Sequence, residues 1–376
     1  MDAEFKQQLE RILGEGEEVV NLQYRRIGNE GVRSVSTVLM NENNKVTTLK
    51  LSGNNFGVEG LKYLSIALMN ENNKVTTLIL SVATICEEGV RYLSTALMTK
   101  NNRVTTLNLS SNNIGVEGVK SLSTALMHEN NKVTTLSLSQ NNIGDDEVSS
   151  LSTALINENN KVIDLDLSFN NIGHEGARSL SIALTNENNK VITLNIRGNN
   201  FGSDGVQSLS TALMNENNKV ITLDLSLNRI GDDGVISLST ALMNERNKVT
   251  RLILSSNNIG TQGLVELFKS LRFSVMNYLR IPKQELNQEA QMLVNKFCGA
   301  FNKYIPRLVC LASVRTTPRI GVQSPHFREL SGDILIRIVQ TLGWFLDLNE
   351  TIRILEEHVE SDNEEESDNE EELIEE

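Results

Sequence analysis

The chain has 376 residues, only 4% of them aromatic, and a formal net charge of −13 at pH 7. Thirteen of its 48 acidic residues lie in 356–376, and the remaining 35 equal the 35 basic residues, so the body is neutral and lacks the basic footprint of a nucleic-acid-binding protein. The three cysteines form no CxxC pair and no apolar run is long enough to cross a bilayer, which argues against a disulfide framework, a zinc site or a membrane span.

The amino-terminal region is expected to begin with a cap helix over residues 1–16. It has no apolar core of the kind that a secretory signal needs, so we expect a cytoplasmic protein. Residues 17–45 read as a degenerate copy of the repeat that follows, since Leu22 stands one repeat length before Leu51.

Eight 29-residue repeats fill residues 46–277, and each predicts a strand, a turn and a helix. Leu78 and Leu80 alternate with other residues as in a strand, and Leu61, Leu64 and Leu68 share one face of a helix. A single repeat has no partner for its leucine face, so the repeats must stack into a solenoid. The first valines of the repeats are Val46, Val75, Val104, Val133, Val162, Val191, Val220 and Val249.

An asparagine recurs in the turn after each strand, where it is expected to bond the backbone groups that the turn leaves free. The column is interrupted once, at Ala83, and the same repeat carries Cys86 where most repeats have glycine. We expect a local irregularity at 81–89, from drift in one copy or from a functional notch. The column consists of Asn54, Asn112, Asn141, Asn170, Asn199, Asn228 and Asn257.

The pattern LxLSxNxIGxEGxxxLxxAL, which recurs with this period, resembles the ribonuclease-inhibitor class of leucine-rich repeats, which includes the sensor regions of NOD-like receptors and the Ran GTPase-activating protein. The resemblance covers roughly residues 17–290. It implies an α/β horseshoe with a parallel β-sheet on the concave face and helices on the convex face. It leaves function open, because one fold serves unrelated tasks.

The concave face is the predicted binding surface, and its informative positions are those that depart from a background of threonine and serine. Charged, aromatic and apolar departures gather between residues 162 and 253, as expected of a protein interface. An alternative is that these charges pair across neighbouring strands and only keep the face soluble. The candidate residues are Asp164, Asp166, Phe169, Asn195, Arg197, Asp224, Leu227, Arg251 and Ile253.

No motif for catalysis or for a cofactor is present. His128 and His174 are expected on the outside of the arc, without a nucleophile beside them. Asp164, Asp166 and Asp224 form a poor match to a metal cage. We therefore expect no enzymatic activity, no cofactor and no metal.

The carboxyl-terminal third departs from the repeat. We expect a shortened repeat and a cap helix over 278–303, a linker over 304–329, a helical segment over 330–355 and a disordered acidic tail over 356–376. Ser361 and Ser367 of the tail resemble acidophilic-kinase sites. The tail is also expected to fold back onto the basic stretch that precedes it.

The sequence predicts a monomeric scaffold that binds a protein partner, and neither nucleic acid nor a membrane. One alternative is a GTPase regulator of the Ran-activating type, whose functional residues find no match here one by one. Another is a ubiquitin-ligase-like or host-directed adaptor, since ILIRIVQTL resembles the opening of an F-box, although Ser331 stands where that motif has proline.

Overall fold

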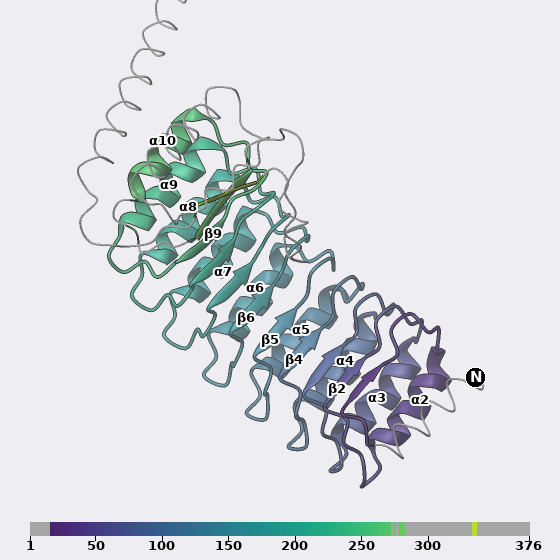
Figure 1. The fold of residues 1–376 in the computed structure, drawn as a ribbon. Helices are drawn as coiled ribbons and strands as arrows, with labels where there is room; N and C mark the ends of the chain where they lie inside the picture. Colours follow the sequence, from purple (N-terminus) through teal and green to yellow (C-terminus); the bar gives the residue numbers. More distant parts are fainter. Residues whose placement is uncertain (1–15, 272–273, 275–277, 283–332, 337–376) are drawn as a thin grey trace, which may run out of the picture. The chain divides into compact units, whose positions relative to one another are not determined.

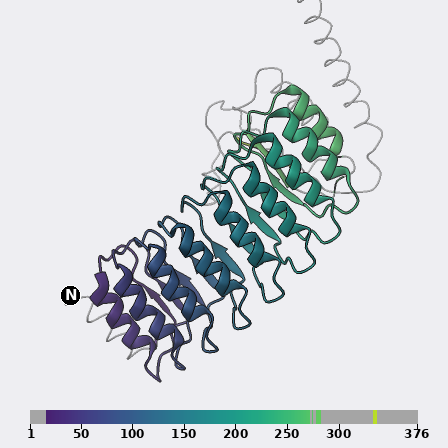
Figure 2. The ribbon, with the colours of Figure 1, turned by 180° about the vertical axis from the view of Figure 1, so that it is seen from behind.

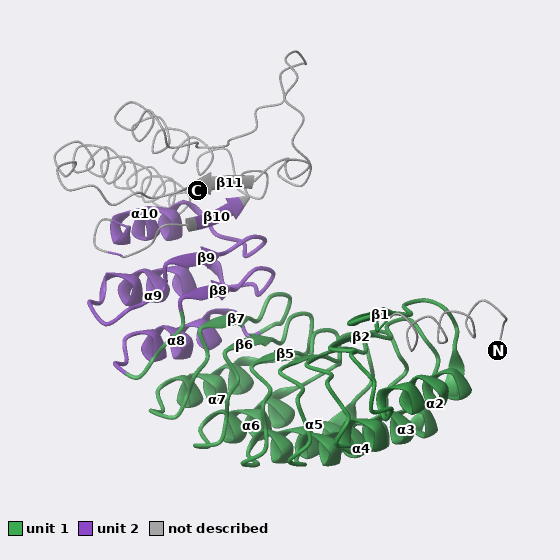
Figure 3. Ribbon diagram, turned by 60° about the horizontal axis from the view of Figure 1, so that its bottom comes forward, with its two compact units in different colours: residues 1–200, 217–220 green, residues 201–216, 221–376 purple. Residues whose placement is uncertain are grey.

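The computed structural model describes residues 16–271, 274, 278–282 and 333–336 (Figure 1). Within each compact unit the strands form one layer, and the helices, seen from behind in Figure 2, form the other. The chain divides into two compact units (Figure 3). Unit 1 comprises residues 1–200 and 217–220, and unit 2 comprises residues 201–216 and 221–376.

Unit 1 confirms the predicted alternation of strand and helix. Neighbouring strands pair in parallel with a shift of one repeat, so that Leu49 lies opposite Leu78 and Leu136 opposite Leu165. The strands are β1 (Val19–Asn21), β2 (Thr48–Lys50), β3 (Thr77–Ile79), β4 (Thr106–Asn108), β5 (Thr135–Ser137), β6 (Asp164–Asp166) and β7 (Thr193–Asn195). The helices are α2 (Gly28–Leu39), α3 (Val58–Met69), α4 (Glu87–Leu97), α5 (Gly115–Leu126), α6 (Asp145–Leu155) and α7 (His174–Leu184).

Unit 2 continues the same pattern. Its elements are α8 (Gly202–Leu213), β8 (Thr222–Asp224), α9 (Gly231–Met243), β9 (Arg251–Ile253), α10 (Thr261–Ser270), β10 (Tyr278–Pro282) and β11 (Asp333–Ile336). β8, β9 and β10 pair in parallel, whereas β11 pairs antiparallel with β10.

β11 differs from the helix that the sequence predicts over 330–355. Its four residues instead pair with the edge of β10 that β9 leaves open, and such an edge is a template for another strand. The rest of 330–355 lies outside the described residues. So do the predicted cap helices, the linker, the acidic tail, Ser361 and Ser367.

The core lies between the two layers of each unit. Leu49 of β2 and Leu61, Leu64 and Leu68 of α3 are fully buried, as are their counterparts in the other repeats. In each three-residue strand from β2 to β8 the central leucine is buried and its two neighbours are half-exposed. The alternation of the strand therefore places every second side chain on an open surface.

The asparagine column forms the expected ladder within each unit, where a member completes the turn of the preceding repeat. Asn141 Nδ2 donates to the Leu109 carbonyl one repeat back at 2.9 Å, and its Oδ1 accepts the Asn112 N–H at 3.2 Å. Ala83 has no side-chain oxygen to offer, and the Phe56 N–H bonds to the Asn54 carbonyl at 3.1 Å. This substitute bond lies in the preceding repeat, whereas the Ala83 and Ile85 N–H groups bond to Asn112 Oδ1 in the regular way, so these bonds do not show the irregularity expected at 81–89.

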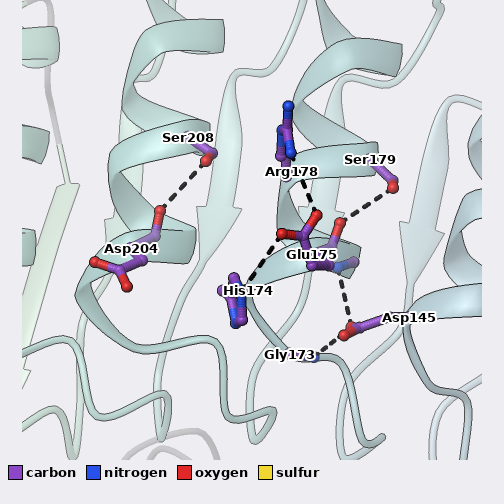
Figure 4. Close-up of polar contacts among 9 residues, drawn as sticks. Asp145, Gly173, His174, Glu175, Arg178, Ser179, Asp204 and Ser208 are labelled. Atoms are coloured by element: carbon purple, nitrogen blue, oxygen red, sulfur yellow. Dashed lines mark hydrogen bonds and ion pairs between the residues drawn. The ribbon is translucent and has the colours of Figure 1, made fainter.

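A second link joins successive helices and was not anticipated from the sequence. Asp145 at the start of α6 accepts the backbone N–H groups of Gly173 and Gly176, at 2.7 and 2.9 Å, at the start of α7 (Figure 4). Val116 occupies the equivalent position one repeat earlier and has no acceptor. The Gly144 N–H of the next helix bonds to Glu147 of its own helix instead, at 2.9 Å. Acidic caps therefore bridge only some of the helix junctions.

Candidate partner-binding surface

The open surface of the sheet in unit 1 is formed by the first and third residues of each strand, which we call the inner surface. From β2 to β7 its third positions are half-exposed, and each differs from the third position of the next strand. They are Lys50, Ile79, Asn108, Ser137, Asp166 and Asn195. The buried leucines between them do not vary in this way, so variation is concentrated where solvent has access.

Asp164 and Asp166 lie side by side on β6 and face neutral residues. The Thr135 hydroxyl donates to Asp164 at 3.3 Å, and the Ser137 hydroxyl donates to Asp166 at 2.9 Å. Asp166 also accepts the Ser168 N–H at 3.0 Å. Among the described residues, neither carboxylate forms an ion pair. Within the described residues, these two charges are not paired across neighbouring strands.

Arg197 replaces the serine that most repeats carry just after the strand. Its guanidinium carbon lies 5.5 Å from the centre of the Phe169 ring, a cation–π contact. No carboxylate of the described residues pairs with Arg197. Asn195 fixes the backbone beneath it, since Asn195 Oδ1 accepts the Arg197 N–H at 3.2 Å. The arginine is thus positioned by an aromatic ring rather than by an acid.

Phe169 combines exposure with an unfavourable backbone conformation. Its side chain is 44% exposed and its φ is +54°, in the left-handed region that costs a bulky residue about 1–2 kcal/mol. The ring lies against the backbone of Gly198, where an added Cβ would come within 2.6 Å of it. Glycine at this position of the next repeat therefore makes room for the ring.

Two apolar residues that were not among the sequence candidates lie at the amino ends of β6 and β7. Thr105 and Thr134 of the preceding repeats each donate a hydroxyl to a carbonyl one repeat back, at 3.2 and 3.3 Å. Ile163 and Ile192 occupy the same column and have no hydroxyl; Ile192 is 37% exposed. A column-by-column comparison of the repeats would have found them, because threonine gives way to isoleucine there.

Unit 2 carries the other candidate residues on its own strands. Asp224 Oδ1 accepts the Ser226 N–H at 2.9 Å and the Ser226 hydroxyl at 2.6 Å. Leu227 has a φ of +59° and is 36% exposed, which repeats the features of Phe169. Arg251 is exposed and Ile253 is half-buried.

Some charges on the outer helices of unit 1 are paired with an opposite charge. Glu175 pairs with Arg178 one turn later at 3.5 Å (Figure 4). Lys120 pairs with Glu117 at 2.8 Å, and this hydrogen bond, helped by the attraction between the two charges, raises the pKa of Lys120. These helix charges thus have partners within one turn, in contrast to those of β6.

The described residues give no sign of a catalytic or metal centre. His128 accepts the Asn130 N–H through Nδ1 in a helix-end turn, and His174 contacts Glu175 at the start of α7 (Figure 4). Within the described part of the chain, no three His, Cys, Asp or Glu side chains group closely enough to hold a metal ion.

None of the described helices is long and apolar enough to cross a membrane.

Comparison with known proteins points to one family. The family model described as Leucine Rich repeat matches the chain seven times, at residues 42–65, 100–123, 129–152, 158–181, 187–210, 216–239 and 247–268. The matches pass over the repeat that carries Ala83 and Cys86. A search of curated proteins found none that matches this chain.

Proposed function

Because this chain is a leucine-rich-repeat protein, we propose that it is a scaffold that holds a protein partner on the inner surface of its strands and acts by binding rather than by catalysis. The observation that carries this proposal is that the charged side chains of β6 and β7 are not paired with opposite charges of the described residues. Asp164, Asp166 and Arg197 stand in otherwise uniform repeats and have no opposite charge of the described residues against them. Charged side chains that have no opposite charge against them are available to complement the charges of a partner.

The proposal extends to the repeat class and the setting of the protein. Helices of 11–13 residues follow the strands from β2 to β8, which supports the ribonuclease-inhibitor class of leucine-rich repeat. We place the protein in the cytoplasm as a monomer without a cofactor.

Affinity capture with matched variants tests the proposal. The intact protein and the triple variant Asp166→Lys/Arg197→Glu/Asp224→Lys are each used to capture proteins from the cells of origin. The control Glu158→Lys/Arg178→Glu/Glu187→Lys makes the same changes of charge on exposed residues of the outer helix and of two helix-end turns.

A protein retained by the intact chain and by the control, and lost from the triple variant, supports binding on the inner surface. Equal retention by all three chains places the contact elsewhere and contradicts the proposal, as does retention of no protein above a blank resin. Circular dichroism of each variant establishes that the fold is preserved.

A further inference from the structure

Asp164 and Asp166 lie on the inner surface of β6, and three apolar residues flank the strands along the chain. Ile163 and Ile192 stand just before β6 and β7, and Phe169 comes three residues after β6. We call these five residues the β6–β7 strip. Phe169 comes six positions after Ile163.

The two ends of the strip are apolar and open. Ile192 is 37% exposed and Phe169 is 44% exposed, although most positions of their columns in other repeats carry small or polar residues. Ile163 and Ile192 stand just before the neighbouring strands β6 and β7, and the Ile192 N–H donates to the Ile163 carbonyl at 2.8 Å, so the amino end presents two isoleucines side by side. Exposed apolar side chains at fixed positions are typical anchor points for a partner.

The middle of the strip carries uncompensated negative charge. The residues opposite Asp164 and Asp166 on β5 are Thr135 and Ser137, and those on β7 are Thr193 and Asn195, all of them neutral. The described residues supply no ion pair to either carboxylate. Two acids on one strand, facing solvent across neutral neighbours, favour a basic occupant.

Arg197 gives the strip a direction. Its guanidinium lies over the Phe169 ring at the carboxyl end, where it repels a second cation. A basic side chain of a partner is therefore favoured at the isoleucine end and in the middle, and disfavoured beside Phe169.

We propose that the β6–β7 strip binds a basic segment of a partner protein, with Lys or Arg over Asp164 and Asp166 and an apolar side chain at each end. This inference rests on the proposed function and adds to it the chemistry of the partner. It also predicts an orientation, since the basic residues lie towards Ile163 and away from Arg197.

A random-peptide library displayed on phage and selected on the full chain tests the inference before any partner has been identified. Selected peptides are then synthesised, and their Kd is measured by fluorescence anisotropy at low and at high salt. We expect Lys or Arg between two apolar positions. The Kd is expected to increase about tenfold with Asp164→Asn/Asp166→Asn and to increase with salt. The control Glu158→Gln/Glu187→Gln, which removes two exposed acids from helix-end turns, leaves the Kd close to that of the intact chain.

Phe169→Gly removes the anchor at the carboxyl end without harming the fold, because glycine accepts a φ of +54°. We expect weaker peptide binding with a thermal midpoint no lower than that of the intact chain. An unchanged Kd for the peptides with this variant would show that Phe169 is not an anchor for the partner.

Thr193→Trp separates failure of this inference from failure of the proposed function. Thr193 lies opposite Asp164 on the inner surface, so tryptophan there blocks the strip while leaving its charges in place. Peptides that Thr193→Trp displaces, but that are not basic or that ignore the Asp→Asn changes, overturn the inference and leave the proposed function standing. Peptides whose Kd changes neither with Thr193→Trp nor with the Asp→Asn changes contradict both this inference and the proposed function.

Discussion

The asparagine ladder and the β6–β7 strip lie a few residues apart on the same repeats. The polar groups of the ladder are hydrogen-bonded within the fold, whereas the carboxylates of the strip face solvent. Asn141 is 3% exposed and its side chain makes bonds to two repeats, so its hydrogen-bonding capacity is consumed by the fold. Asp164 accepts one long bond from a neighbouring hydroxyl of the described residues and keeps its charge facing solvent. Polar residues that recur identically are structural here, whereas those that depart from the repeat are free to contact something else.

The largest effect on stability is expected from Asn141→Ala. The change leaves the Asn112 N–H without its acceptor and the Leu109 carbonyl without the Asn141 donor in a buried turn. An unsatisfied buried group of this kind costs about 1–3 kcal/mol. Urea unfolding followed by circular dichroism measures the loss. Asn113→Ala, at an exposed position of the preceding turn, is the control. An equal loss of stability in both variants would contradict a special structural role for the ladder asparagines.

Restoring the interrupted position tests the ladder in the other direction. Ala83→Asn supplies the oxygen that this repeat lacks, and it is expected to raise the free energy of unfolding by about 1 kcal/mol. Hydrogen exchange should then slow at the Phe56 amide, which bonds to Asn54 within its own turn in the present chain. Faster exchange at Phe56, or a lower unfolding midpoint, would show that the turn is adapted to alanine.

Removal of the bridging cap should have a more local effect. Asp145→Ala deprives the first turn of α7 of an acceptor for two backbone N–H groups, which costs about 1 kcal/mol. Hydrogen exchange is expected to accelerate at Gly173 and Gly176. Asp146→Ala removes the adjacent carboxylate, which caps neither group, and it serves as the control. Equal acceleration in the two variants would contradict a bridge between helices.

The smallest effect on stability is expected on the strip itself. Asp166→Asn keeps an oxygen for the Ser168 N–H and removes a charge that has no partner of opposite sign among the described residues. We expect the free energy of unfolding to change by less than about 0.5 kcal/mol. Calorimetry of the full chain measures it. A loss comparable to that of Asn141→Ala would make Asp166 a structural residue and weaken the contrast between strip and ladder.

The sequence was sufficient for the architecture because the 29-residue period displays the core directly. The leucines, the turn asparagine and the strand positions each recur at a fixed position of the repeat, so they can be recognised without knowing any distance in the structure. Contacts between different positions of the repeat were harder to predict from the sequence. The bridge from Asp145 to Gly173 joins different positions of two repeats, and the pairing of Asp333–Ile336 with β10 joins segments that are distant in the chain.

The candidate surface was only partly predictable from the sequence. Asp164 and Arg197 were visible as departures from the background, but the sequence left their pairing open, because it does not show which side chains meet across strands. Ile163 and Ile192 were overlooked since an isoleucine beside a buried valine resembles core. The left-handed backbone at Phe169 was overlooked, although Gly53 and Gly198 stand in the same column and glycine favours that conformation.

The direction of the asparagine ladder has a consequence for synthesis on the ribosome. Asparagines of the ladder complete the turn of the repeat that precedes them, as Asn170 does for Asn141 and Ile143. A newly made repeat therefore emerges with open amides, and its turn closes only after the next repeat has left the exit tunnel. The nascent chain would mature one repeat behind its own elongation, from the amino terminus onward.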